Sequence, residues 1–147
     1  MTITRMDHVG VVVDDLEAAI AFFVELGMER QGEAMPVAGR WVDQVVGLDD
    51  VQVDIAFVAT PDGHGRLELT RFRQPVARTA EPGAPANTQG LRRLMFLVDD
   101  LDDTVARLRA HGGELVGEVG RFEDVYRLCY LRGPGGVIVA LSEEVAA

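Results

Sequence analysis

His8-Val9-Gly10-Val11-Val12-Val13-Asp14-Asp15-Leu16 is the stretch that decides the fold, because a version of it returns later in the same chain. The second copy is Arg93-Leu94-Met95-Phe96-Leu97-Val98-Asp99-Asp100-Leu101. The match then continues at the same offset without a gap: Gly27, Glu29, Gly32 and Glu33 return as Gly112, Glu114, Gly117 and Glu118. A repeat of this length indicates a duplicated structural unit, so each half of the chain serves as a control for the other.

Length and charge exclude several classes of protein. The 147 residues suit a single domain. The formal charge of −10 disfavours nucleic acid and anionic membranes as partners, since both bind surfaces rich in lysine and arginine. No apolar run approaches the ~20 residues of a membrane span, and the first residues lack a signal-peptide pattern. Cys129 is the only cysteine, so no internal disulfide can form. We expect a cytoplasmic protein with no nucleic-acid and no membrane partner.

Hydrophobic periodicity predicts the same order of elements in both halves. In the first half we expect a strand over 4–13, a helix capped at Asp14 and ending at Gly27, and strands near 29–34, 51–59 and 65–73. In the second half we expect a strand over 91–98, a helix from about residue 101 to a stop at Gly112, and strands near 114–119, 125–132 and 136–142. Each half is therefore predicted to be a βαβββ module.

Two modules packed as one domain are the natural outcome of this order. Residues 75–90 are rich in Pro, Ala, Thr and Gly, a composition typical of a surface linker. Either half alone has too few elements to close a core. We therefore expect an α+β fold and a single domain over 1–147, with module 1 at about 1–74, a linker at about 75–90 and module 2 at about 91–147.

Strand alternation predicts which side chains share a face. In the first strand the alternate valines should pack under the helix, which leaves His8 on the opposite face. The same argument leaves Glu68, Arg93 and Ala140 on that face of their own strands. The four side chains are therefore predicted at equivalent points of a concave face, and the two halves differ there by His8 against Arg93 and by Glu68 against Ala140.

The chain resembles the vicinal oxygen chelate superfamily, which includes glyoxalase I, extradiol dioxygenases, methylmalonyl-CoA epimerase, and fosfomycin- and bleomycin-resistance proteins. Four stretches carry the resemblance: Asp7-His8-Val9-Gly10-Val11-Val12-Val13-Asp14-Asp15-Leu16, Gly65-Arg66-Leu67-Glu68-Leu69, Val98-Asp99-Asp100-Leu101 and Gly133-Pro134-Gly135-Gly136-Val137-Ile138-Val139. The resemblance implies two tandem βαβββ modules that form a cupped, barrel-like mixed sheet with the helices outside. It also implies a homodimer.

The resemblance further implies a divalent metal held by the first and last strands of each module. His8 matches the usual histidine and Glu68 the usual carboxylate. Arg93 and Ala140 stand where the second module usually has a histidine and a glutamate. This chain therefore departs from the pattern at two of the four expected ligand positions.

Two interpretations of the metal site stay open. Imidazole and carboxylate are suitable ligands for Fe, Mn, Ni or Zn, so His8 and Glu68 are candidate metal ligands. Two ligands are fewer than the three of a usual catalytic site, and Arg93 cannot ligate because its guanidinium stays protonated. Candidates for a third ligand are Gln44, His64 and Glu123. In the other interpretation Arg93 pairs with Glu68 and supplies the positive charge itself, in a metal-free polar pocket.

Glu68 and Arg93 are also the candidate catalytic residues. Glu68 would act as a general base toward a substrate proton, and Arg93 would stabilise the developing oxyanion. The candidate substrate-binding residues are Arg93, Tyr126 and Trp41; Trp41 would cover the mouth of the pocket. Core packing is the competing interpretation of both aromatic side chains. Cys129 has apolar neighbours and is expected to be a buried, inert thiol.

Two functions follow from these residues. The first is a glyoxalase/dioxygenase-like enzyme, of lyase or isomerase type, that acts on a small oxygenated substrate through an incomplete divalent-metal site. The second is a metal-free protein that binds a small molecule of antibiotic type and resembles the bleomycin-resistance proteins. The two missing ligand positions favour the second function, and the retention of His8 together with Glu68 favours the first.

Overall fold

The structure is a computed structural model that describes residues 2–81 and 83–145. The chain divides into two compact units, Met1–Arg78 and Thr79–Ala147, and each unit contains its own sheet. The division falls inside the segment 75–90 that the sequence indicated as a linker.

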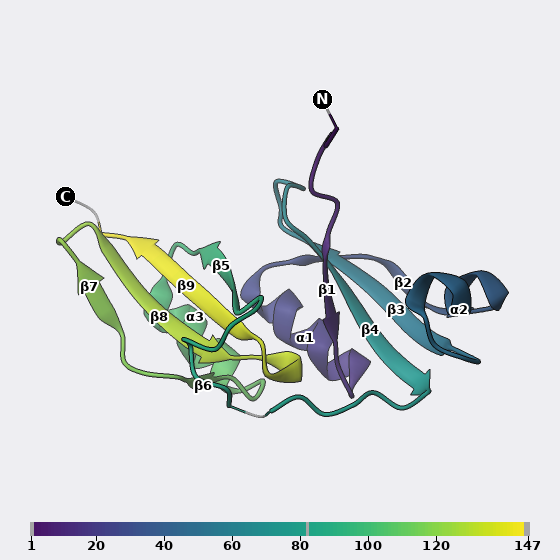
Figure 1. The fold of residues 1–147 in the computed structure, drawn as a ribbon. Coiled ribbons are helices and arrows are strands. Elements are labelled where there is room, and N and C mark those ends of the chain that lie inside the picture. The colour runs from purple at the N-terminus through teal and green to yellow at the C-terminus, as the bar shows by residue number, and fades with distance from the viewer. Residues whose placement is uncertain (1, 82, 146–147) are drawn as a thin grey trace. The chain divides into compact units, whose positions relative to one another are not determined.

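Unit 1 alternates strands and helices around one sheet. In chain order its elements are β1 (Val9–Val12), α1 (Leu16–Leu26), β2 (Glu29–Ala38), α2 (Arg40–Val46), β3 (Gln52–Ala59) and β4 (Arg66–Gln74). The strand order in the sheet is β1-β4-β3-β2 (Figure 1). β1 runs parallel to β4, and the other neighbouring strands are antiparallel.

Several boundaries in unit 1 differ from those expected. β1 begins at Val9 and not at residue 4, because its pairing with β4 begins there. β2 extends to Ala38, beyond the expected end near residue 34. The helix α1 is capped by Asp15 and not by Asp14, since the Asp15 carboxylate accepts a hydrogen bond from the backbone N–H of Ala18. The segment that becomes α2 was not predicted as a helix.

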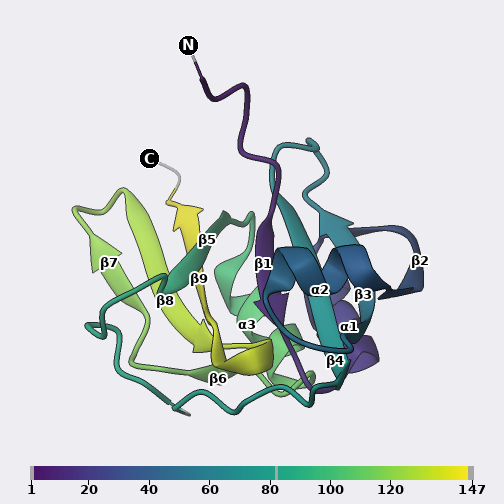
Figure 2. The same ribbon diagram turned by 45° about the vertical axis from the view of Figure 1, so that its right-hand side comes forward.

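The two helices of unit 1 lie on opposite faces of the sheet (Figure 2). The buried face of α1 consists of Leu16, Ala19, Ile20, Phe22 and Phe23. The helix α2 buries Val42, which packs with Val51 and Val53. One face of the sheet therefore belongs to the α1 core, and the other is left for α2 and the polar side chains described below.

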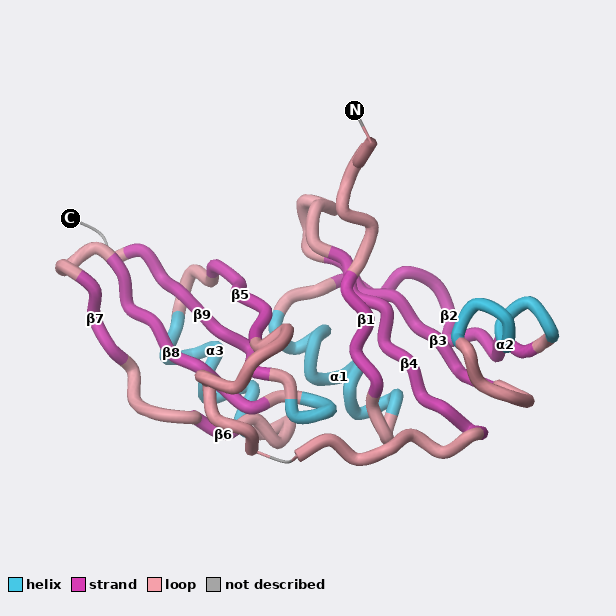
Figure 3. The backbone as a smooth tube through the Cα atoms, in the orientation of Figure 1, coloured by secondary structure: helices cyan, strands magenta, loops and turns pink. Residues whose placement is uncertain are grey.

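Unit 2 repeats the arrangement with one strand more. Its elements are β5 (Arg93–Leu97), α3 (Leu101–Arg109), β6 (Glu114–Leu115), β7 (Gly120–Phe122), β8 (Tyr126–Arg132), a 3-10 turn (Pro134–Gly136) and β9 (Ile138–Glu144). The strand order is β5-β9-β8-β6, and β7 pairs with β8 (Figure 3). The 3-10 turn occupies the start of the segment expected as the last strand, so β9 begins at Ile138.

The registers of the two sheets show that the halves are built alike. Gly10 pairs with Glu68 across β1 and β4, and Met95 pairs with Ala140 across β5 and β9. Ala140 therefore occupies in unit 2 the position that Glu68 occupies in unit 1, as the strand parity predicted. The predicted α+β class and the two βαβββ modules are confirmed, with α2 and β7 as additions.

Among the described residues, no helix is both long and apolar enough to cross a membrane.

Candidate functional site

A histidine and a glutamate lie close together on one face of the unit 1 sheet, the face opposite α1. Glu68 is in β4, and its Oε2 lies 3.5 Å from Nε2 of His8, the residue directly before β1. The Glu68 side chain is 25% exposed and the His8 side chain is 34% exposed, so a ligand can reach both. Strand alternation placed these two residues on one face, and the structure brings their polar atoms together.

Asp7 fixes the orientation of the His8 ring. The Oδ2 atom of Asp7 lies 2.7 Å from Nδ1 of His8, and the same carboxylate accepts hydrogen bonds from Arg5 at 2.8 Å and from Arg66 at 3.1 Å. The hydrogen bond from His8 holds the pKa of Asp7 below its ordinary value, and the hydrogen bond from Arg5 lowers it further. Asp7 is therefore an anion at neutral pH, Nδ1 of His8 donates to it, and Nε2 is the ring nitrogen that faces Glu68.

Three further side chains of the same face support the pair. The His8 ring packs edge-to-face on Phe57, with ring centroids 5.7 Å apart, and the guanidinium carbon of Arg66 lies 3.8 Å from the centre of the same Phe57 ring. Thr70 donates to Oε1 of Glu68 at 3.2 Å. Because Thr70 occupies Oε1, the other carboxylate oxygen is the one directed at His8.

An apolar pocket of about 380 Å³ adjoins Glu68 on this face. It lies between α2 and the sheet, and Figure 2 shows α2 in front of the strands. The lining residues from α2 are Trp41, Val42, Val45 and Val46, and those from the strands are Gly10, Val11, Val12, Val37, Val53, Ile55, Glu68, Thr70 and Phe72. Apolar walls with few polar groups are the usual composition of a small-molecule site.

Trp41 lines this pocket and is nevertheless 62% exposed. Its exposure contradicts a core-packing role, which was the competing interpretation of this residue. A large exposed aromatic side chain at the edge of an apolar pocket is well placed to contact a ligand. The role of Trp41 in substrate binding stays a prediction.

The predicted site residues of unit 2 lie on their own sheet. The guanidinium carbon of Arg93 lies 5.4 Å from the ring centre of Tyr130, and Tyr130 pairs with Ala140. Tyr126 is half-buried and pairs with Glu144, nearer the other end of β8. Tyr130 is thus the aromatic residue beside Arg93. The pairing of Arg93 with Glu68 joins the two units and stays a prediction.

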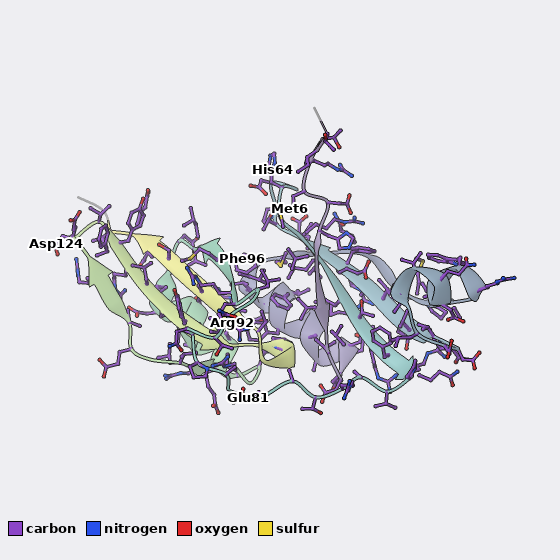
Figure 4. All side chains as sticks on the ribbon, viewed as in Figure 1. Met6, His64, Glu81, Arg92, Phe96 and Asp124 are labelled. Carbon is purple, nitrogen blue, oxygen red and sulfur yellow. The ribbon has the colours of Figure 1, made fainter. Side chains whose placement is uncertain are left out.

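The described residues contain no group of three or more His, Cys, Asp or Glu side chains placed to hold a metal ion. His64 lies in the loop between β3 and β4, where Figure 4 labels it, and its backbone N–H binds Asp62. Gln44 lies on α2, and Glu123 follows β7 in unit 2. Within unit 1 the described residues therefore offer His8 and Glu68 as a pair of ligands that lie within reach of one metal ion.

Cys129 is buried in β8, and burial raises the pKa of its thiol above the ordinary value. A thiol with a raised pKa carries little thiolate at neutral pH. This supports the prediction of an inert cysteine.

Alternation along the strand that carries Glu68 places Arg66 and Thr70 on the same face, although sequence reasoning gave them no role, and it missed Asp7 and Phe57. Phe57 pairs with Glu68 across β3 and β4, so a cross-strand register would have found it. Asp7 lies beside His8 in the chain but outside β1, where alternation does not predict side-chain direction. The signal for Asp7 was chemical, since an acidic residue next to a candidate ligand histidine can bind its second nitrogen.

The fold and the site together define a class: a two-module βαβββ protein with a histidine–carboxylate pair beside an apolar pocket. The family model described as "Glyoxalase/Bleomycin resistance protein/Dioxygenase superfamily" matches residues 5–141. The chain belongs to this superfamily.

Two relatives are similar in sequence. A crystal structure of a glyoxalase family protein from Bacillus cereus is 46% identical, with a TM-score of 0.93 over 99% of this chain and 97% of that chain. The uncharacterized protein YaeR of Escherichia coli (strain K12) is 31% identical over 108 residues, which are 73% of this chain and 70% of YaeR.

Two solved structures of lower identity share the fold. TnmS3, an antibiotic binding protein from Streptomyces sp. CB03234, is 22% identical, with a TM-score of 0.62 over 98% of both chains. The fosfomycin resistance protein FosX from Listeria monocytogenes, complexed with Mn(II) and sulfate, is 14% identical, with a TM-score of 0.60 over 97% of this chain and 92% of that chain.

Proposed function

We propose that this protein is an enzyme of lyase or isomerase type that acts on a small oxygenated substrate and holds a divalent metal ion on His8 and Glu68. The observation that supports the proposal is the 3.5 Å distance between Nε2 of His8 and Oε2 of Glu68, with Nδ1 of His8 engaged by Asp7. The crystal structure of FosX with Mn(II) shows that a protein of this fold takes such an ion.

The chemistry of the two atoms favours a cation between them. A neutral His8 that donates from Nδ1 to Asp7 carries a lone pair on Nε2, and that lone pair faces a carboxylate oxygen. Two acceptors that face each other need a proton or a metal ion between them. Ligand bonds of ~2.0–2.2 Å to nitrogen and oxygen allow both atoms to bind one ion at neighbouring positions. The pair therefore fits two positions of a divalent ion, and the other positions require further donors.

In this proposal each residue has a separate task. His8 and Glu68 would hold the ion, and Asp7 would orient the His8 ring. A bound divalent ion would polarise a substrate oxygen as a Lewis acid. Trp41 would position the apolar part of the substrate in the adjoining pocket, whose polar end is formed by Glu68 and Thr70. Tyr126 and Arg93 remain candidate substrate-binding residues from unit 2.

Metal analysis after incubation with Fe(II), Mn(II), Ni(II) or Zn(II) tests the proposal. We expect one ion per chain, bound by the wild-type protein and lost in His8→Ala and in Glu68→Gln. Glu33→Gln is the matched control for Glu68→Gln, because it removes an exposed carboxylate of the same unit and should retain the metal. Equal metal loss from Glu68→Gln and Glu33→Gln, or no stoichiometric metal in the wild type, would contradict the proposal.

The second candidate function is a metal-free protein that sequesters a small molecule. Ala140 at the position equivalent to Glu68, and Arg93 at the position equivalent to His8, favour it. In that case Glu68 would need a positive partner, and Arg93 would supply it. Absence of metal in the wild type, together with a rise in melting temperature on addition of an aromatic or cationic compound, would support this function. Loss of that rise in Arg93→Gln would assign the positive charge to Arg93.

A homodimer and a cytoplasmic location are parts of the same proposal. The resemblance to the superfamily supports the homodimer, and light scattering on the purified protein tests it. A mass of one chain at micromolar concentration would contradict it.

A further inference from the structure

The pocket beside Glu68 has an electrostatic character that restricts its ligand. Of its described lining residues, none carries a positive charge, and Glu68 is the charged one. The nearby Arg66 points elsewhere, since it binds Asp7 and Gln31 and covers Phe57. An anionic ligand would therefore meet the Glu68 carboxylate, and no lining residue of the pocket would compensate its charge.

The walls of the pocket select an apolar body. The side chains of α2 and of the strands are mainly those of valine, isoleucine, phenylalanine and tryptophan. Trp41 and Val45 keep 62% and 77% exposure although they line the pocket, so α2 presents apolar surface that a ligand would cover. A volume of about 380 Å³ is at the lower end of ligand pockets, which suits a compound with one or two rings.

The polar end of the pocket accepts hydrogen bonds. Thr70 donates to Oε1 of Glu68, and Oε2 faces Nε2 of His8 at 3.5 Å. The two oxygens of a carboxylate accept about four hydrogen bonds, so Glu68 has further lone pairs for a donor that enters from the pocket. A hydroxyl or ammonium group on the ligand fits this position, and a carboxylate, phosphate or phosphonate does not.

We propose that the ligand of this protein is a small ring-bearing compound whose apolar body lies against Trp41 and Val45 and whose polar end is an uncharged hydroxyl or an ammonium group directed at Glu68. This inference rests on the second candidate function, the metal-free binder, because a metal ion on Glu68 would occupy the position of the ligand's polar end. It adds the class of ligand: compounds with an anionic head group are rejected by the metal-free pocket.

Three probe compounds of one shape test the inference: 4-tert-butylbenzyl alcohol, 4-tert-butylbenzylamine and 4-tert-butylbenzoate. Trp41 is the only tryptophan, so fluorescence excited at the red edge of its absorption reports on this pocket alone. The titration uses full-length protein freed of metal with EDTA, since a cation on Glu68 would itself attract the benzoate. We expect the amine and the alcohol to bind at least about ten-fold more tightly than the benzoate.

Matched variants assign the effect to the residues named. Val45→Gln should weaken binding of the alcohol about five-fold or more, because it places a polar amide on the apolar wall. Val76→Gln is the control, since Val76 is as exposed as Val45, at 79% against 77%, and lies outside the pocket. Glu68→Gln should abolish the preference of the amine over the benzoate and retain binding of the alcohol.

Two outcomes would overturn the inference: tighter binding of the benzoate than of the alcohol, or equal weakening by Val45→Gln and Val76→Gln. These outcomes are distinct from failure of the proposed function, which is measured by metal content alone. A protein without metal that still ranks the probes as expected would support the ligand class and contradict the metal.

Discussion

At the scale of single residues, Asp7 has the most specific role that no sequence pattern indicated. Its carboxylate holds Nδ1 of His8 at 2.7 Å and is itself held by Arg5 and Arg66. Such a partner sets the tautomer of a ligand histidine and raises its basicity. We predict that Asp7→Asn weakens binding of Mn(II) or Zn(II) about 10–100-fold, measured by isothermal titration calorimetry.

The control for this prediction is Asp49→Asn, which removes one negative charge from an exposed position of the same unit. If general electrostatic attraction held the ion, both variants would weaken binding equally, and the orienting role of Asp7 would be wrong. Circular dichroism of both variants checks that the fold is retained.

The candidate pair itself could be predicted from the sequence, and its surroundings could not. Alternation within strands fixes the face on which Glu68 lies, and the parallel pairing of β1 with β4 brings that face to His8. The contacts of His8 with Asp7 and Phe57 depend on side-chain rotamers and on the register of β3, and one sequence does not contain that information.

At the scale of elements, β4 is the strand that positions the site. It lies between β1 and β3, and it carries Glu68 on one face and Leu69, with 0% exposure, on the other. We predict that Leu69→Ala lowers the free energy of unfolding by about 2–5 kcal/mol, because it leaves a cavity in the core. Urea denaturation measures the change. Leu48→Ala, at a partly exposed leucine of unit 1, should cost less than about 1 kcal/mol. Similar losses in both variants would contradict the position of the core.

A second prediction at this scale concerns Arg127, which ties α3 to β8 and β9. Arg127 donates to the two oxygens of Asp102 at 2.9 and 3.1 Å and to Glu143 at 3.3 Å. The hydrogen bond from Arg127 lowers the pKa of Asp102 below its ordinary value of 3.8. Because the folded pKa is the lower one, this contribution to stability is present above about pH 3.8 and is lost as the pH falls through the folded pKa.

Removal of the guanidinium tests that assignment. In Arg127→Gln we expect the pKa of Asp102 to rise toward 3.8. NMR titration of the carboxyl carbon of Asp102 measures this change. Arg121→Gln should leave the pKa of Asp102 unchanged, since Arg121 faces Asp124. An unchanged Asp102 titration in Arg127→Gln would show that another group lowers its pKa.

The helix α2 shows why one element escaped sequence analysis. It has seven residues, three of them valines, and Gly39 precedes it without a side-chain cap. Short segments rich in β-branched residues carry no clear helical signal, since valine favours strands and one or two turns show little periodicity. Packing of Val42 onto Val51 and Val53 stabilises this helix, and that contact is tertiary.

At the scale of the whole molecule, the internal repeat made the fold predictable, because two copies of one pattern agree on the element order. The repeat also explains where prediction stops. Arg93 and Ala140 stand in unit 2 where His8 and Glu68 stand in unit 1, so the repeat predicts their position and not their role. The register confirms that Ala140 is the structural counterpart of Glu68, so the two halves differ by a substitution at an aligned position.

The sequence predicts that both modules form one domain, since neither half alone supplies much of a core. If that is so, the two units unfold together, although the chain divides at Arg78. We predict that Leu69→Ala in unit 1 increases hydrogen exchange of the slowest amides in both units by the same factor, and that Leu141→Ala in unit 2 does likewise. Both leucines have 0% exposure, so the two variants are matched. Faster exchange confined to the unit that carries the substitution would show two independent domains. A functional site made by residues of both modules would then require the two units to associate with a free energy of their own, separate from the folding of each unit.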